Sequence, residues 1–192
     1  MGEYLKKPVK IKRPKIQKTL SAENIPTEKE YNQLLAYCDQ HNAKFAYIVR
    51  LLGTTGCRVS ELIQFTYEQI QEGTVILKGK GSKYRRFFFT KQMQQEAKGK
   101  SGYVCMNRYG SQMTTRGIAQ ELKNLGEKAG IAREKMHPHA FRHFFAKMYL
   151  QKTKDVVSLA DILGHGSVDT TRIYLQKSQD EQKREINRVV NW

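Results

Sequence analysis

The chain has 192 residues, of which 39% are hydrophobic, including eight Phe and ten Tyr. This length fits one domain, and this apolar content excludes a wholly disordered chain. Lys plus Arg number 34 and Asp plus Glu number 18, so the formal net charge is +16. Such a charge on a small protein indicates an acidic partner, and nucleic acid is the leading candidate.

The sequence also disfavours membrane-spanning, secreted and cysteine-stabilised proteins. No apolar run approaches the ~18 residues that a membrane-spanning helix needs, and the basic start lacks the apolar stretch of a secretory signal. The cysteines Cys38, Cys57 and Cys105 are odd in number, widely spaced and outside any CxxC pair. This pattern is typical of reduced thiols rather than a disulfide framework or a zinc site. We therefore expect a cytoplasmic protein with no membrane partner, located at the nucleoid when bound to DNA.

Residues 1–22 are predicted to form an arm rather than part of the folded domain. Seven Lys or Arg lie between Lys6 and Lys18, and Pro8 and Pro14 oppose helix formation. Three interpretations stay open: an arm on a phosphate backbone, a linker from an upstream domain, or a solvated tail.

The next segments predict helices. Thr27 and Glu30 have the spacing of a capping box, and an apolar pattern of period 3.6 continues to Cys38. A second apolar pattern over 45–52 runs into Gly53-Thr54-Thr55-Gly56, which is predicted to contain the C-cap and a turn. A short helix over 58–63 is predicted to follow.

A strand pair is predicted at 74–77 and 84–89, joined by a hairpin turn at Gly79-Lys80-Gly81-Ser82. In the rest of the chain, apolar patterns predict helices over 118–129, 138–150, 156–163 and 167–175. Near the C-terminus, Ile186, Val189 and Val190 form one apolar stripe. The predicted fold class is therefore α+β: mostly α with a small antiparallel β-sheet.

The histidines allow two kinds of site. His139 and His143 have the i, i+4 spacing of a zinc-binding helix, and His165 is a possible third ligand. However, no Glu follows His139, and Arg142 would place a fixed positive charge beside the cation. We therefore expect no metal and no cofactor, and we take His143 to be a hydrogen-bonded core residue.

The second kind of site is a phosphate site. Arg58 follows a glycine turn, Arg142 shares a helix with His139, and Lys80 lies at a hairpin tip. Arginine forks match phosphate oxygens, and histidines add hydrogen-bond donors or proton carriers. Tyr174 is a candidate nucleophile, because nearby cations make a phenolate accessible. Taken singly, Arg58 and Lys80 are better explained as surface cations, and Tyr174 as a half-buried core tyrosine.

Together these segments resemble the catalytic domain of the tyrosine recombinases, the phage integrase family, over about residues 25–180. Four boxes stand in the family's order: Thr55-Gly56-Cys57-Arg58-Val59-Ser60-Glu61-Leu62, Gly79-Lys80-Gly81-Ser82-Lys83-Tyr84-Arg85, His137-Pro138-His139-Ala140-Phe141-Arg142-His143, and Leu163-Gly164-His165-Gly166-Ser167 continuing to Thr170-Thr171-Arg172-Ile173-Tyr174. Any one box is a weak signal, whereas all four in order are specific.

The resemblance implies a fold, an activity and a role for each matching residue. Arg58 and Arg142 are expected to bind the non-bridging oxygens of the scissile phosphate in double-stranded DNA. His139 and His165 are expected to bind the phosphate and help move protons. Lys80 is the expected general acid, with Lys83 as a second candidate, and Tyr174 is the expected nucleophile of a 3′-phosphotyrosyl intermediate.

The resemblance also implies a domain plan. Residues 23–178 are the expected catalytic domain, and residues 179–192 are an expected C-terminal helix or tail that either docks on a neighbouring subunit or folds back. Family members usually carry an additional N-terminal domain that clamps DNA, so we expect this chain to be a fragment or a short relative. A homo-oligomer, a tetramer on DNA, is expected.

Two other functions compete with the recombinase. A type IB topoisomerase has a similar set of residues but reseals the same strand. A DNA-binding paralogue without catalysis is the alternative outside enzymes, although all the side chains expected for catalysis are present.

Overall fold

A computed structural model describes residues 24–78, 84–164, 183 and 186–188. Its first helix, α1 (Glu28–His41), begins at the predicted capping box. The Thr27 hydroxyl accepts a hydrogen bond from the Glu30 amide at 3.2 Å, and the Glu30 carboxylate accepts one from the Thr27 amide at 2.8 Å. Two amides of the first turn therefore gain partners, which confirms the predicted start of this helix.

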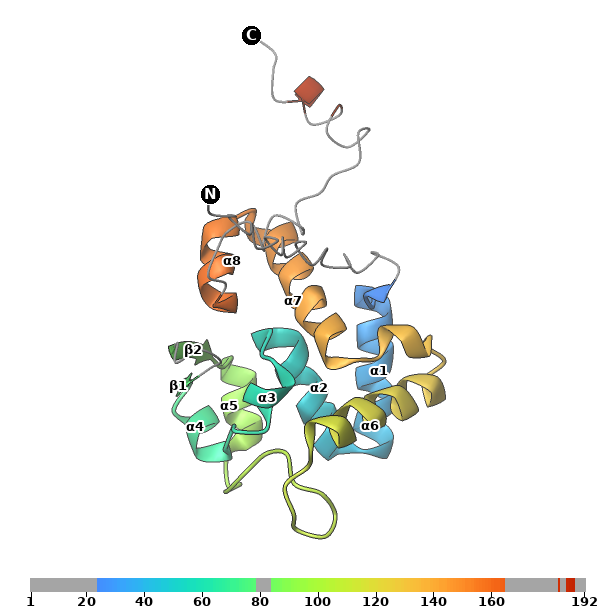
Figure 1. The fold of residues 1–192 in the computed structure, drawn as a ribbon, viewed down its shortest axis with the longest axis vertical. Helices are drawn as coiled ribbons and strands as arrows, with labels where there is room; N and C mark the ends of the chain where they lie inside the picture. Colours follow the sequence, from blue (N-terminus) through green and yellow to red (C-terminus); the bar gives the residue numbers. More distant parts are fainter. Residues whose placement is uncertain (1–23, 79–83, 165–182, 184–185, 189–192) are drawn as a thin grey trace, which may run out of the picture.

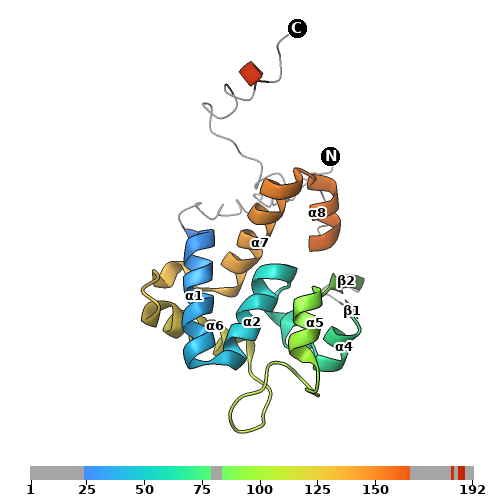
Figure 2. The same cartoon turned by 180° about the vertical axis from the view of Figure 1, so that it is seen from behind.

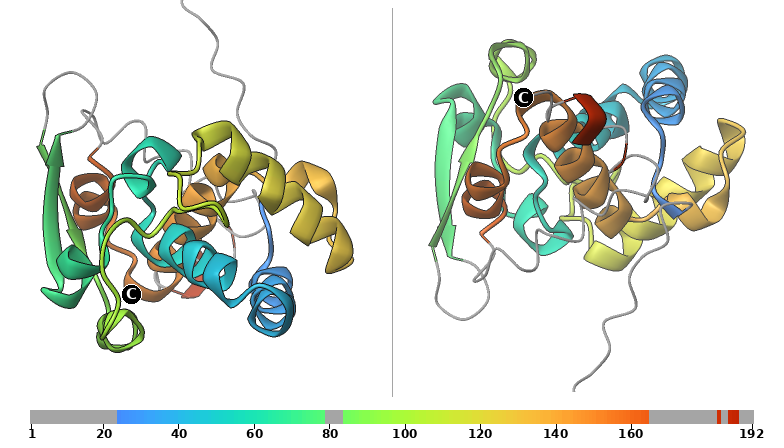
Figure 3. Two further views of the ribbon diagram at one scale, coloured as in Figure 1. Left: turned by 90° about the horizontal axis from the view of Figure 1, so that it is seen from below. Right: turned by 90° about the horizontal axis from the view of Figure 1, so that it is seen from above.

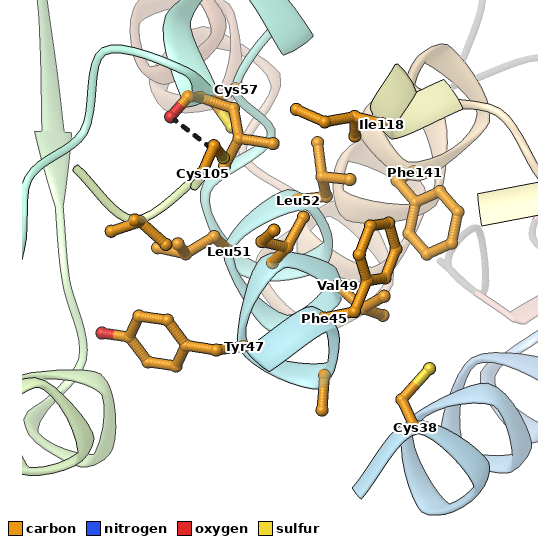
Figure 4. Packing of buried hydrophobic residues seen from close by; sticks show 14 of the residues in the cluster. Cys38, Phe45, Tyr47, Val49, Leu51, Leu52, Cys57, Cys105, Ile118 and Phe141 are labelled. Atoms are coloured by element: carbon orange, nitrogen blue, oxygen red, sulfur yellow. Dashed lines mark hydrogen bonds between the residues drawn. The ribbon is translucent and has the colours of Figure 1, made fainter. Parts of the chain in front are cut away.

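The central helix is α2 (Ala43–Thr55), which packs against both α1 and α7 (Figure 1). It is buried on nearly all sides, and its apolar side chains form the middle of the core (Figure 4). The helix continues through Gly53 and ends at Gly56. A Cβ at Gly53 would lie 2.5 Å from the Tyr31 ring, so glycine at this helical position permits close packing of α1 against α2.

Two short helices and a 3-10 turn were not predicted from the sequence. They are α4 (Tyr67–Gln71), α5 (Lys91–Ala97) and Arg133–Lys135, while the predicted short helix is observed as α3 (Val59–Leu62). The hydroxyls of Thr66 and Thr90 cap the first turns of α4 and α5. Segments this short contain too few turns for an apolar period to be recognised.

The sheet consists of β1 (Thr74–Lys78) and β2 (Tyr84–Phe88), paired antiparallel from Thr74–Phe88 to Lys78–Tyr84. Its side chains alternate between the two faces, so Arg85 and Phe87 are buried while Arg86 and Phe88 are exposed. The sheet lies beside α8 at one edge of the molecule, and α6 lies at the opposite edge (Figure 3).

The C-terminal half of the described chain contributes α6 (Thr115–Lys128), α7 (Pro138–Thr153) and α8 (Val156–Leu163). The His137 side chain caps α7, and Pro138 occupies its first turn as predicted. Figure 2 shows α7 between α1 and α8, and α8 ends at Gly164 in the left-handed conformation, with φ 63°. The predicted fold class, mostly helical with a small antiparallel sheet, is confirmed.

Some predictions concern other parts of the chain. The arm over 1–22, the turn at 79–82, the helix over 167–175 and the stripe residues Val189 and Val190 lie outside the described residues. Ile186, the remaining stripe residue, is exposed. No helix in the described ranges combines the length and apolar character needed to cross a membrane.

Candidate active site

The first predicted arginine follows a tight turn after α2. Gly56 has φ 58°, which turns the chain, and Arg58 then occupies the N-cap of α3 in an extended conformation. Glu61 holds Arg58 twice: its carboxylate accepts from the Arg58 amide at 2.7 Å and from Nη1 of its side chain at 3.0 Å. The Arg58 side chain is 44% exposed, so its guanidinium reaches the surface from a fixed base.

The second predicted arginine, Arg142 on α7, is buried. Its Nη1 donates to the carbonyl oxygen of Gly56 at 2.8 Å, and its Nη2 donates to the carbonyl oxygen of Leu163 at 2.7 Å. These bonds join α7 to the turn that precedes Arg58 and to the C-terminal end of α8. Arg142 therefore holds three separate segments in one arrangement.

His139 lies one turn before His143 on α7, and the two rings are in contact. Their Nε2 atoms are 2.8 Å apart, and the ring planes are almost perpendicular. One ring must donate and the other accept, so both cannot be fully protonated at once. The buried His143 thus has a ring partner, in agreement with the prediction of a hydrogen-bonded core histidine.

The electrostatic environment keeps His139 neutral near neutral pH. Burial lowers the pKa of His139 below its usual value of 6.5, and the positive charges of Arg142 and Arg58 lower it further. Both arginines therefore act on this ring through space. An anion between these groups would reverse the effect, because a nearby negative charge favours the protonated imidazole.

Two site residues received no role in the sequence analysis. Glu61 is buried between Arg58 and Arg85, and its Oε2 accepts from Nη1 of Arg85 at 2.6 Å. Arg85 alternates with Phe87 on the inward face of β2, and a charged residue at an inward position of a strand requires a buried partner. Two features of the sequence could have identified this pair. Arg85 stands at an inward position of an alternating strand, and Glu61 stands three residues after Arg58.

The structure brings Arg58, His139 and Arg142 close together where the turn after α2, the start of α7 and the end of α8 meet, with Arg58 exposed and Arg142 buried behind it. Lys80, Lys83, His165 and Tyr174 lie outside the described residues. No three His, Cys, Asp or Glu side chains within the described ranges gather in a way that could hold a metal ion. The residues that do gather are donors suited to an anion, and two guanidinium groups beside an imidazole are matched to a phosphodiester.

Comparison with known proteins identifies the family. Residues 25–181 match the Phage integrase family. The chain belongs to this family. The tyrosine recombinase XerC of Lactobacillus delbrueckii subsp. bulgaricus is 32% identical over 147 residues, which cover 68% of this chain and 50% of that protein. The chain therefore spans about half the length of the XerC relatives that it matches.

Solved structures agree with this assignment. A crystal structure of XerA recombinase has a TM-score of 0.72 and 25% identity, covering 88% of this chain and 65% of that one. The XerH site-specific recombinase, in a pre-cleavage complex with its difH substrate, has a TM-score of 0.67 and 25% identity, covering 88% of this chain and 55% of that one. The predicted resemblance to the phage integrase family is thus confirmed, together with its fold.

Proposed function

We propose that this chain is the catalytic domain of a site-specific recombinase that cuts and rejoins double-stranded DNA through a 3′-phosphotyrosyl intermediate. The observation that carries the proposal is the proximity of two arginines, Arg58 and Arg142, to the His139 ring. Family membership and the recombinase names of the relatives support it. The net charge of +16 supports DNA as the partner, because cationic proteins gain affinity by displacing the counterions of the phosphate backbone.

In the proposed reaction, Arg58 and Arg142 bind the two non-bridging oxygens of the scissile phosphate. The phenolic oxygen of Tyr174 attacks phosphorus, the bond from phosphorus to O5′ breaks, and Lys80 gives a proton to the departing O5′. His139 and His165 bind the phosphate and take part in proton movement, including acceptance of the Tyr174 proton. A 5′ hydroxyl from a partner strand then attacks the phosphotyrosine and restores a phosphodiester.

The energetics of this scheme rely on fixed side-chain charges. Negative charge grows on the non-bridging oxygens in the transition state, and donors that are already oriented need no reorganisation to stabilise it. Loss of one such donor typically lowers the rate about 10²–10³-fold. The covalent bond to Tyr174 preserves the energy of the phosphodiester, so this reaction needs no ATP, and the cations are supplied by side chains.

The domain plan and the assembly belong to the same proposal. Residues 1–22 form a basic arm or linker, residues 23–178 the catalytic domain, and residues 179–192 a tail for contact with another subunit. Exchange between two duplexes requires four strand ends, so a homo-oligomer, a tetramer on DNA, would supply one nucleophile for each.

The test is covalent capture on nicked suicide duplexes that carry candidate recombination sites, in EDTA, analysed on a denaturing gel. The expected result is a protein–DNA adduct with the wild type and with Tyr109→Phe, and none with Tyr174→Phe. Tyr109 is a matched control, because it is an exposed tyrosine in a loop remote from α7 and α8 along the chain.

The pattern of products separates the competing functions. Adducts that rejoin a partner strand support the recombinase, whereas resealing of the original strand alone indicates topoisomerase activity. Salt-sensitive DNA binding without any adduct points to a protein that binds without cutting. An adduct that persists in Tyr174→Phe would show that the nucleophile is misassigned.

A further inference from the structure

The inward face of β2 carries a buried cation with a complete set of partners. Arg85 is 5% exposed, and its guanidinium lies over the Phe87 ring, 4.3 Å from the ring centre. Its Nη1 donates to Glu61 Oε2 at 2.6 Å, its Nε to the carbonyl oxygen of Ile162 at 2.8 Å, and its Nη2 to that of Gly56 at 3.2 Å. One side chain therefore connects the sheet with α3, with the turn after α2 and with α8.

The first of these connections leads to Arg58. The two oxygens of Glu61 are shared: Oε1 accepts from the Arg58 guanidinium, and Oε2 accepts from Arg85 and from the Arg58 amide. A buried carboxylate that holds Arg58 is thus itself held by Arg85. Movement of Arg85 would let the Glu61 carboxylate rotate, and Arg58 would then lose its orientation.

The second connection leads to Arg142. Arg85 and Arg142 both donate to the Gly56 carbonyl, and at the end of α8 they take consecutive carbonyls, Ile162 and Leu163. The last carbonyls of a helix lack partners within the helix and carry partial negative charge, so two cations are well placed there. The two arginines hold the same pair of segments from opposite sides, one from β2 and one from α7.

We propose that Arg85 is a positioning residue for the strand-cleavage reaction: it orients Arg58 through Glu61, and it fixes the Gly56 turn and the end of α8 against which Arg142 is placed. This inference rests on the proposed function, because it assigns Arg58 and Arg142 to the scissile phosphate. Arg85 itself contacts no reacting atom. The fork matters because three different guanidinium nitrogens meet three separate acceptors, whereas a lysine ammonium presents all its donors from one nitrogen.

The first test follows Arg58 directly and needs no DNA. The side-chain Nε–Hε signal of Arg58 is assigned in nitrogen-15 NMR spectra by its loss in Arg58→Lys. In Arg85→Gln we expect this signal to move to the position of a solvated arginine. The matched control is Arg86→Gln, which removes the same charge from the next residue on the exposed face of β2 and should leave the signal in place.

The second test measures adduct formation at saturating DNA. Arg85→Gln should lower the rate about 10- to 100-fold, because small displacements of catalytic groups are costly. The DNA concentration for half-maximal rate should change less than threefold. In an Arg58→Ala background the further loss from Arg85→Gln should be clearly smaller than in the wild type, since only the placement of Arg142 is then left to be disturbed. A purely structural role predicts the same factor in both backgrounds.

The outcomes separate the two proposals. An Arg58 signal that is unchanged in folded Arg85→Gln, or full multiplication of the two losses, overturns the positioning role. If the wild type yields no adduct, the proposed function fails, and the NMR comparison still decides whether Arg85 orients Arg58. If Arg85→Gln does not fold, Arg85→Lys replaces it, because lysine keeps the positive charge but lacks the guanidinium fork. The expected Arg58 signal shift and the loss of adduct-formation rate are then smaller than those predicted for Arg85→Gln.

Discussion

The turn at Gly56 offers a sharp test of how the site is held together. At φ 58° and ψ 25°, an alanine would be strained by roughly 1–2 kcal/mol on backbone grounds alone. Its Cβ would also lie 2.5 Å from Cδ1 of Phe145 and 3.0 Å from Cδ2 of Leu163. Overpacking of this kind adds about 1–3 kcal/mol. We therefore expect Gly56→Ala to destabilise the domain by roughly 2–5 kcal/mol.

The matched control is Gly99→Ala, because Gly99 has a similar φ of 72° but no atom within 4 Å of the added Cβ. This variant carries the backbone strain without the clash, so it should lose only about 1–2 kcal/mol. Urea denaturation followed by circular dichroism gives the free energy of unfolding for both variants by linear extrapolation. The difference between them isolates the contact with Phe145 and Leu163.

The site should also respond to this substitution. Relief of the clash must shift the Gly56 carbonyl, which accepts from both Arg142 and Arg85, so adduct formation should slow more in Gly56→Ala than in Gly99→Ala. Phe145→Leu should partly relieve the clash, so Gly56→Ala should cost less in that background. Equal unfolding free energies for Gly56→Ala and Gly99→Ala would refute the packing argument.

Three further predictions concern stability and reactivity. Burial lowers the pKa of His139 and of His137, so below about pH 6.5 the unfolded chain binds protons that the folded chain does not. Stability should fall as pH drops from 7.5 to 5.5, and urea midpoints should show a weaker decline in His139→Gln than in the wild type; equal declines would contradict this. Burial raises the pKa of Cys38 to about 11 and those of Cys57 and Cys105 to about 12. A disulfide reagent at pH 8 should therefore label all three thiols only after unfolding. Rapid labelling of the native protein would be inconsistent with the structure. Thr27→Ala removes the cap of α1 and should lower the unfolding free energy by about 1 kcal/mol, measured in urea; no change would mean that the cap is dispensable.

Local patterns in the sequence were sufficient to predict many element boundaries. The capping box at Thr27, Pro138 in the first turn of α7 and Gly164 after α8 act within a few residues of the backbone groups that they satisfy. A β-branched run and an aromatic run likewise predicted the two paired strands. Gly53 was the exception, because its role depends on Tyr31 of another helix rather than on its own turn.

The sequence by itself also determined the family, because four boxes in a fixed order are specific even when each is weak. Through that resemblance it predicted Arg58, His139 and Arg142 as phosphate ligands, and these roles stay predictions although the structure places the three residues near one another. Lys80, His165 and Tyr174 remain predictions, since they lie outside the described residues.

Only the tertiary structure decided how the arginines are held. Arg85 and Ile162 are 77 positions apart in the chain, and Arg142 and Gly56 are 86 apart, so no local pattern links them. A buried cation is stable only where carboxylates and carbonyls converge on it, and that convergence is a property of packed segments. The sequence therefore predicted which donors the proposed site contains, while the packing of β2, α7 and α8 decided how its arginines are held.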